Sequence, residues 1–300
     1  MKSVKNPMQA GRFESIPPSG GWRACMVCAL MLLAVAPVRA DPQEAIPKPA
    51  YLLGVFPHLT AARLEKIFAP IAADMSAVVG RRVLIRTRTT YAAFSEELRK
   101  QRYDIALLQP FDYVQVREAY SMIPLARRAA PLSAVFVVNE AVPIYSLADL
   151  RGKELALPPE TAAVSHLAKA ALVHAGLMPG KDVILHYQRS HDACLQQLLI
   201  RRVDACGTAD YPLRFFKEKM NIPFQELARS PTIPHVLFAV HPRVVERDRE
   251  AIKQSILSWL DRDAGRRILS NGRLQPFVAA SDEEYEIVRT YWREIKDQTE

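Results

Sequence analysis

Short apolar runs alternate with longer amphipathic segments from about residue 50 to the end of the chain. The short runs predict strands, because a strand buried on both faces is continuously apolar. The longer segments repeat apolar residues at helical spacing. Expected strands lie at 51–56, 83–87, 104–108, 123–126, 134–138, 154–157, 183–187, 204–207 and 235–240. Expected helices lie at 60–79, 91–101, from 110 onward, 146–152, 161–175, 191–202, around 213–219 and over most of the last sixty residues.

Capping residues set several of these boundaries. Thr60 is expected to open one helix and Gly80 to end it. Ser146 and Asp149 have the spacing of a capping box, and Ser190 is a typical helix N-cap. The aromatic residues of the last helices are expected to lie in the core: Trp259, Tyr285, Tyr291 and Trp292.

The alternating order predicts an α/β protein with parallel sheets covered by helices on both faces. Ligands of such sheets bind beyond the carboxyl ends of the strands, where helices begin. Three strand-to-helix turns have this character: 108–110, 157–161 and 189–192. They are the first places to look for a binding site.

The third turn contains Ser190, His191 and Asp192, the residue types of a serine hydrolase. Consecutive residues entering a helix point in different directions, whereas a catalytic triad converges in space from distant positions. The Gly-x-Ser-x-Gly pattern is also missing around Ser190. Two interpretations remain: an anion-binding helix start, or an ordinary cap beside a solvated histidine. No catalytic residue is predicted.

Residues 1–40 have the pattern of a secretory signal peptide. Basic residues precede an apolar run at 24–36 that is too short to span a membrane, and Ala40 follows as the expected cleavage position. The remaining chain has 35 basic and 31 acidic residues, a net charge of +4. That mild charge favours anionic ligands and gives no indication of nucleic-acid binding. No further segment is expected to span a membrane.

Cys194 and Cys206 are the only cysteines that follow the signal peptide. In an exported protein two cysteines can form a disulfide. Two buried thiols, or a pair of thiol ligands for a soft ion, are the alternatives. The histidines outside position 191 show no metal-ligand spacing and are expected to be structural or exposed, so no metal or cofactor is predicted.

Seven segments together resemble the phosphate/phosphite/phosphonate-binding proteins, the periplasmic components of phosphonate ABC importers. The segments are 52–57 (LLGVFP), 90–94 (TYAAF), 103–114 (YDIALLQPFDYV), 146–153 (SLADLRGK), 190–192 (SHD), 203–207 (VDACG) and 238–242 (FAVHP). The resemblance implies a type II periplasmic-binding-protein fold with two α/β lobes joined by a two-strand hinge. One lobe is expected to hold residues 46–130 plus 240–300 and the other residues 131–239.

The resemblance also implies a ligand site between the lobes. By position, the expected contacts are Tyr91, the turn containing Gln109, Phe111 and Tyr113, the helix start at Glu160 and Thr161, the pair Ser190 and His191, and Asp210 as a partner for a ligand amino group. The chain departs from the family at 159–163, which reads PETAA where the family has a hydroxyl-rich Ser-Thr-Ser-Gly-like run. Glu160 is therefore expected to repel a dianion unless a cationic ligand group meets it.

The resemblance predicts a periplasmic protein that captures a small anionic or zwitterionic ligand for an ABC permease. The alternative is a sensor of an oxyanion or of arsenite that reports to a histidine kinase. An enzyme would need a nucleophile with a positioned base, which Ser190 lacks. A hydrolase is the less favoured alternative.

Overall fold

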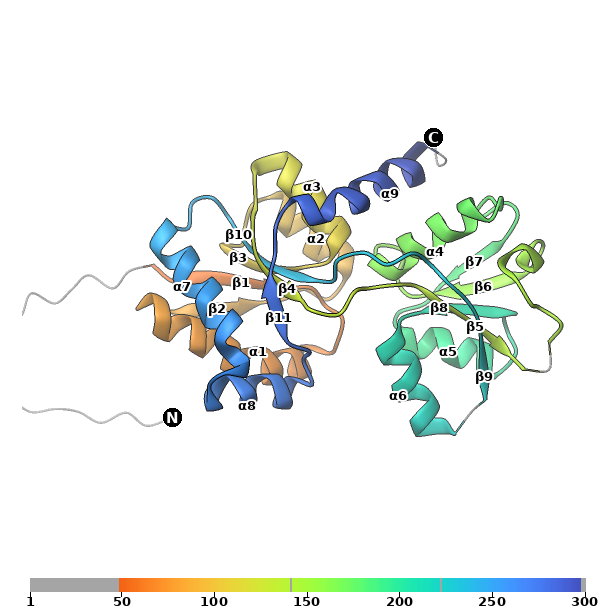
Figure 1. The fold of residues 1–300 in the computed structure, drawn as a ribbon, viewed down its shortest axis with the longest axis horizontal. Helices are drawn as coiled ribbons and strands as arrows, with labels where there is room; N and C mark the ends of the chain where they lie inside the picture. Colours follow the sequence, from red (N-terminus) through yellow and green to blue (C-terminus); the bar gives the residue numbers. More distant parts are fainter. Residues whose placement is uncertain (1–48, 141, 222, 298–300) are drawn as a thin grey trace, which may run out of the picture. The chain divides into compact units, whose positions relative to one another are not determined.

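The computed structural model describes residues 49–140, 142–221 and 223–297. They belong to one compact unit, Pro47–Glu300. The predicted signal peptide lies outside the described residues. Within the unit, two separate sheets each carry their own helices (Figure 1).

The first sheet has six strands in the order β11-β4-β10-β3-β1-β2. The bounds are β1 Tyr51–Val55, β2 Val83–Arg86, β3 Ile105–Leu108, β4 Ile123–Arg128, β10 Leu237–Val240 and β11 Phe277–Ala279. Strands β1, β2 and β3 are parallel, whereas β10 is antiparallel to both β3 and β4. The associated helices are α1 Ala61–Val79, α2 Tyr91–Arg99, α3 Pro110–Tyr120, α7 Glu246–Leu257, α8 Asp263–Gly272 and α9 Glu286–Asp297.

The second sheet has five strands in the order β7-β6-β8-β5-β9. The bounds are β5 Val135–Asn139, β6 Glu154–Leu157, β7 Ile184–Tyr187, β8 Ala205–Thr208 and β9 Phe224–Arg229. Its helices are α4 Ala163–His174, α5 His191–Leu199 and α6 Asp210–Met220, preceded by a 3-10 turn at Leu147–Leu150 with the predicted capping box. Strands β6, β7 and β8 are parallel, and β5 is antiparallel to β8 and β9.

The chain passes between the sheets along 129–134 and again along 230–236. Leu132 and Ile233 pair there as an isolated antiparallel bridge, each N–H donating to the other's carbonyl oxygen at 2.9 Å. The predicted fold class is confirmed: two α/β lobes are connected by two extended segments. The exact lobe boundaries stay a prediction. The chain was expected to re-enter the first lobe at residue 240, whereas β10, a strand of the first sheet, begins at Leu237.

Local signals located most elements. Gly80 ends α1 in the left-handed conformation, and Thr90 caps α2 by accepting from the Ala93 N–H at 3.1 Å. Phe94 and Leu98 are buried, as are Trp259, Tyr285 and Tyr291, while Trp292 is only partly buried against the core.

Three expectations about the elements were wrong. Both sheets are mixed and not parallel, because the strands entering or leaving each lobe run against their neighbours. Strands β9 and β11 were missed, since β9 alternates poorly and is mostly exposed, and β11 is only three residues long. Helix α4 begins at Ala163, two residues later than expected.

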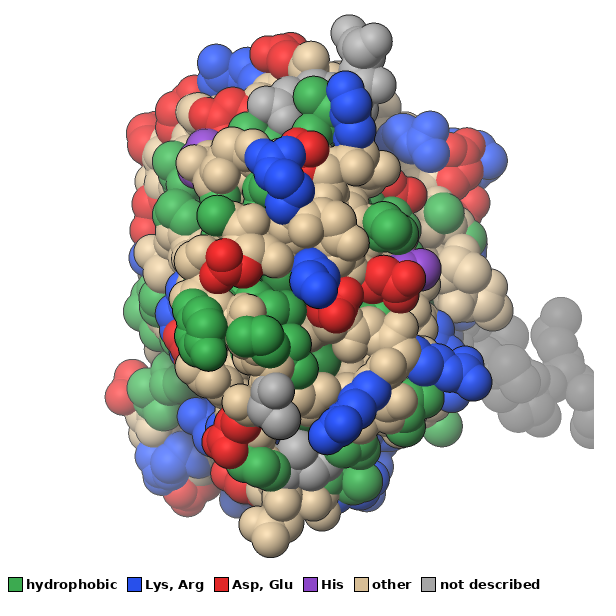
Figure 2. Space-filling view, turned by 90° about the vertical axis from the view of Figure 1, so that its right-hand side faces the viewer, with side chains coloured by type: hydrophobic (Ala, Val, Ile, Leu, Met, Phe, Trp, Pro, Cys, Tyr) green, Lys and Arg blue, Asp and Glu red, His purple; other side chains and the backbone are tan. Residues whose placement is uncertain are grey.

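Basic, acidic and hydrophobic side chains are interspersed over the face shown in Figure 2. A nucleic-acid interface gathers charge of one sign, so this face gives no support to one. Among the described residues no helix is long and apolar enough to cross a bilayer.

Candidate functional site

Strand pairing brings four segments of the first sheet to one edge. Leu237, at the start of β10, pairs with both Leu108 at the end of β3 and Arg127 near the end of β4. The carboxyl end of parallel β1 lies at the same edge. We call four residues at these strand ends the first edge: His58 and Gln109, which follow β1 and β3, Arg128, which ends β4, and His235, which precedes β10.

The second sheet has an equivalent edge. Strands β6, β7 and β8 are parallel, and Val135 of β5 pairs with both Thr208 and Arg229. The residues that end or follow these strands form the second edge: Glu160, Thr161, Ser190, His191, Thr208, Asp210 and Arg229. Both edges therefore have the location at which ligands bind in α/β sheets.

Ser190 and His191 have different roles at the second edge. The Ser190 hydroxyl accepts from the Ala193 N–H at 3.1 Å and caps α5. The His191 ring Nδ1 lies 3.0 Å from Oγ1 of Thr208, a residue that is fully buried. Burial lowers the pKa of His191 to about 4, so the ligand-free ring is neutral at pH 7. Ser190 has no base beside it, and the three consecutive residues are not a triad.

Gln109 connects the first edge to the second. Its side-chain oxygen accepts from the Ala163 N–H at 3.0 Å, and its amide donates to the Thr161 carbonyl at 3.3 Å and to Asp112 at 3.2 Å. Residue Ala162 is the N-cap of α4 and offers no side-chain acceptor. Gln109 therefore caps α4 from the other lobe, which no local sequence signal could indicate.

Replacing Gln109 with alanine is expected to lower the free energy of unfolding by about 1–2 kcal/mol, because the Ala163 N–H would lose its acceptor. Thermal unfolding measures the change. Gln115→Ala is the matched control, since Gln115 lies in α3, the helix that Gln109 precedes, and among the described residues its amide donates to the Phe111 carbonyl of that helix. Equal stability of the two variants would contradict the capping role.

Glu160 is paired within the protein. Its carboxylate lies 3.6 Å from Nζ of Lys169, a residue that is only 8% exposed. Burial lowers the pKa of Lys169, and the nearby Glu160 carboxylate opposes that change. The expected repulsion of an anion by Glu160 is thus offset by a cation that the sequence reading missed. Thr161 is exposed, and its hydroxyl has no partner among the described residues.

Tyr91 is the first residue of α2. Its ring packs against that of Phe56, with the ring centroids 5.9 Å apart. Burial raises the pKa of its hydroxyl, with a smaller contribution from the Asp112 carboxylate. Asp112 itself accepts from Ser95 and Gln109, yet burial raises its pKa to about 6. In the described part of the chain the Tyr91 hydroxyl has no hydrogen-bond partner, so it remains available to a ligand.

Phe111 and Tyr113 lie in the core, and we leave both out of the proposed site. Phe111 is 2% exposed and packs against His166 and Trp292, with centroids 4.8 and 6.2 Å away. The Tyr113 hydroxyl donates to Asp282 at 2.7 Å.

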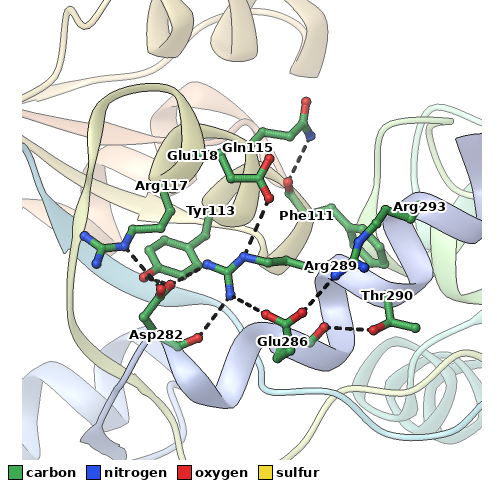
Figure 3. Close-up of polar contacts among 10 residues, drawn as sticks. All are labelled: Phe111, Tyr113, Gln115, Arg117, Glu118, Asp282, Glu286, Arg289, Thr290 and Arg293. Atoms are coloured by element: carbon green, nitrogen blue, oxygen red, sulfur yellow. Dashed lines mark hydrogen bonds and ion pairs between the residues drawn. The ribbon is translucent and has the colours of Figure 1, made fainter.

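Figure 3 shows how this contact joins α3 to the C-terminal segment of the chain. Asp282 also accepts from Arg289 at 2.6 Å and lies 3.3 Å from Arg117. Burial raises the pKa of Tyr113, and its hydrogen bond to Asp282 acts in the same direction. Tyr113 is therefore part of the attachment of α9 to α3.

Asp210 also has a partner inside the protein. Its carboxylate lies 2.7 Å from Nη1 of Arg229, which also pairs with Glu226. A ligand amino group would have to compete with this arginine for Asp210. The residue is therefore poorly suited to the role that the resemblance implied.

Three residues of the first edge were missed. His58 follows β1, Arg128 ends β4 and His235 precedes β10, whereas the sequence predicted structural or exposed roles for the histidines and none for Arg128. Burial lowers the pKa of His58 to about 4 and that of His235 to about 3, and the charge of Arg128 contributes to both shifts. Their positions at strand ends were the signal that could have found them.

Cys194 and Cys206 are joined by a disulfide between α5 and β8, with Cα atoms 5.9 Å apart. Arsenite sensing through cysteine needs free thiols, so this pairing removes the ground for that alternative. Among the described residues no cluster of three or more histidine, cysteine or acidic side chains could hold a metal ion.

Comparison with known families shows to which family the chain belongs. The sequence profile of the family described as "ABC transporter, phosphonate, periplasmic substrate-binding protein" matches residues 53–285. The chain belongs to this family. Members of this family are periplasmic substrate-binding proteins, as the resemblance implied.

Solved structures of other binding proteins share the fold. PhnD1 from Prochlorococcus marinus (MIT 9301), in complex with methylphosphonate, has a TM-score of 0.72 at 19% identity, covering 82% of this chain and 98% of that one. The binding protein component of an ABC phosphonate transporter from Pseudomonas aeruginosa has a TM-score of 0.71 at 16% identity, covering 84% and 88%. XAC2383 from Xanthomonas citri, bound to ATP, has a TM-score of 0.67 at 16% identity, covering 84% and 99%. Identities this low establish the fold and leave the ligand open.

Proposed function

We propose that this protein binds a small oxyanion of the phosphonate or phosphate class between its first and second edges and delivers it to an ABC permease. The observation that carries the proposal is that two acidic side chains of the second edge are already paired with cations of the protein itself. Asp210 is paired with Arg229 and Glu160 with Lys169. The groups left for a ligand are donors, the hydroxyls of Tyr91 and Thr161 and the ring of His191.

Capture requires only these donors and a hinge. A ligand that contacts both edges stabilises the state in which they meet, by its differential affinity for that state. The Gln109 bridge already holds the start of α4 against the first edge. The Ser190 hydroxyl caps a helix and His191 faces Thr208, so neither is arranged as a nucleophile with a base. We therefore propose binding without catalysis, in the periplasm, after cleavage of the signal peptide near Ala40.

A thermal-shift series on the mature protein, residues 41–300, tests this function. The ligands are methylphosphonate, 2-aminoethylphosphonate, phosphite, phosphate and sulfate. A ligand at a hundred times its dissociation constant is expected to add about 2.7 kcal/mol of stability, which raises Tm by roughly 5–10 °C. No response to any phosphorus oxyanion would overturn the proposal. A response to sulfate alone would move the ligand class away from phosphorus.

A further inference from the structure

Arg128 ends β4 at the first edge and is held there by its backbone. Its N–H donates to the Val236 carbonyl oxygen at 3.0 Å, and its Cα pairs with Phe277 of β11. The Nε atom of its guanidinium is buried and has no hydrogen-bond partner among the described residues. A buried donor without an acceptor destabilises a fold, so this arrangement calls for a missing partner.

The charge of Arg128 is also uncompensated. Among the described residues no carboxylate lies within ion-pair distance of its guanidinium, whereas the adjacent Arg127 donates to Glu284 at 2.6 and 2.9 Å. Burial lowers the pKa of Arg128 to about 10, which still leaves it charged at pH 7. Arg128 is half-buried, and a charge partly removed from water without a counter-charge destabilises a fold; a bound anion reduces that penalty.

The neighbours of Arg128 are neutral and in part donors. His235 accepts from the Val236 N–H through Nδ1 at 2.7 Å, so its neutral ring carries the proton on Nε2. His58 has Nδ1 3.0 Å from the Phe56 carbonyl, which fixes that nitrogen as its donor. Tyr211, from α6 of the other lobe, lies within electrostatic range of Arg128. Arg128 thus interacts electrostatically with a residue of the second lobe.

The start of α4 offers an anion little by comparison. The Ala163 N–H donates to Gln109, and the Thr161 carbonyl also faces that amide. The nearby Glu160 carboxylate adds negative charge, which Lys169 balances. The charge of a ligand therefore has to be met at another position.

We propose that Arg128 supplies the counter-charge for the anionic head group of the ligand, so that the head group sits against the end of β4 and not at the start of α4. This rests on the proposed function. It specifies a ligand with at least one full negative charge on compact oxygens, because a planar guanidinium binds such groups through paired N–H donors.

Arg128→Met tests the assignment, with methylphosphonate, phosphate and sulfate as probes. The variant is expected to weaken binding of the probe that the wild type prefers by about 30-fold or more, since removing one partner of a buried charge pair has effects of that size. Without ligand the same variant is expected to unfold at an equal or higher temperature than wild type, because it loses an unpaired buried charge. Arg128→Lys should fall between the two in affinity.

Arg127→Met is the matched control on the same strand. It breaks the pair with Glu284 and is expected to lower Tm while leaving affinity within about twofold. If wild type binds a probe and Arg128→Met binds it equally well, the assignment of Arg128 is overturned and the proposed function stands. A large loss of ligand-free stability in Arg128→Met would also overturn it, by making Arg128 structural. If wild type binds none of the probes, the proposed function fails and this assignment with it.

Discussion

Lowering the pH from 7 to 4.5 is expected to reduce the free energy of unfolding of the ligand-free protein by about 2 kcal/mol or more. Burial lowers the pKa of His58 and His191 to about 4 and of His166 and His235 to about 3. The unfolded chain takes up a proton at each near pH 6.5, while the folded protein does not. Their contribution is complete above about pH 6.5 and is lost as the pH falls toward 4 and 3.

One group acts in the opposite direction over the same range. Burial raises the pKa of Asp112 to about 6, so this carboxyl takes up its proton in the folded protein first and stabilises it at lower pH. Four histidines against one carboxyl leave a net loss in acid. Carboxylates with lowered pKa values, such as Asp282 and Glu284, add to the loss at still lower pH.

Thermal unfolding from pH 7.5 to 4.5 measures this effect. His166→Leu should flatten the profile, because His166 is buried beside Phe111 and Trp292 and its Nδ1 has no partner. His174→Ala, which removes a surface histidine from the same helix, should leave the profile close to that of wild type. A Tm that stays constant down to pH 4.5 would show that these rings are hydrated or charged in the folded state.

The elements that the sequence predicted are those set by local signals. Apolar runs located most strands, and the cap Ser190 placed the helix start that it controls. Helix α4 shows the limit of this reasoning. Its N-cap Ala162 has no capping side chain, and the acceptor comes from Gln109 of the other lobe. The direction of the strands could not be predicted for the same reason, because pairing with distant segments decides whether a strand runs parallel or antiparallel to its neighbours.

The residues of the candidate site show the same contrast between local sequence signals and contacts with distant segments. A strand followed by a cap is visible in sequence, so the prediction could include Ser190 and His191; both lie at the second edge, and their contact with a ligand stays a prediction. The partners that define the charge of the site are distant or face other elements. Asp210 is neutralised by Arg229 across a sheet edge, and Glu160 by Lys169 two turns into α4. The resemblance assigned those acids to a ligand, which stays a prediction, whereas the structure pairs each of them with a cation of the protein itself.

Replacing His191 with alanine is expected to weaken ligand binding by at least about tenfold. The ring is held by the Thr208 hydroxyl at 3.0 Å and is neutral without ligand. An oxyanion beside it would favour the protonated ring, and hydrogen bonds to charged groups contribute roughly 1.5–3 kcal/mol. Isothermal titration with the phosphorus oxyanion that gives the largest thermal shift measures the loss.

Two further variants test whether the His191 ring itself contacts the ligand. Thr208→Val keeps the volume of a fully buried side chain but removes the hydroxyl that positions the ring, so it should weaken binding less than His191→Ala does. Asp192→Asn, at the exposed next position of α5, should change affinity by no more than about threefold. If His191→Ala binds as tightly as wild type, the ring is only a neighbour of the cap. The ligand would then be bound by other groups, such as Arg128 and the hydroxyls of Tyr91 and Thr161, and the affinity would no longer depend on the charge of that ring.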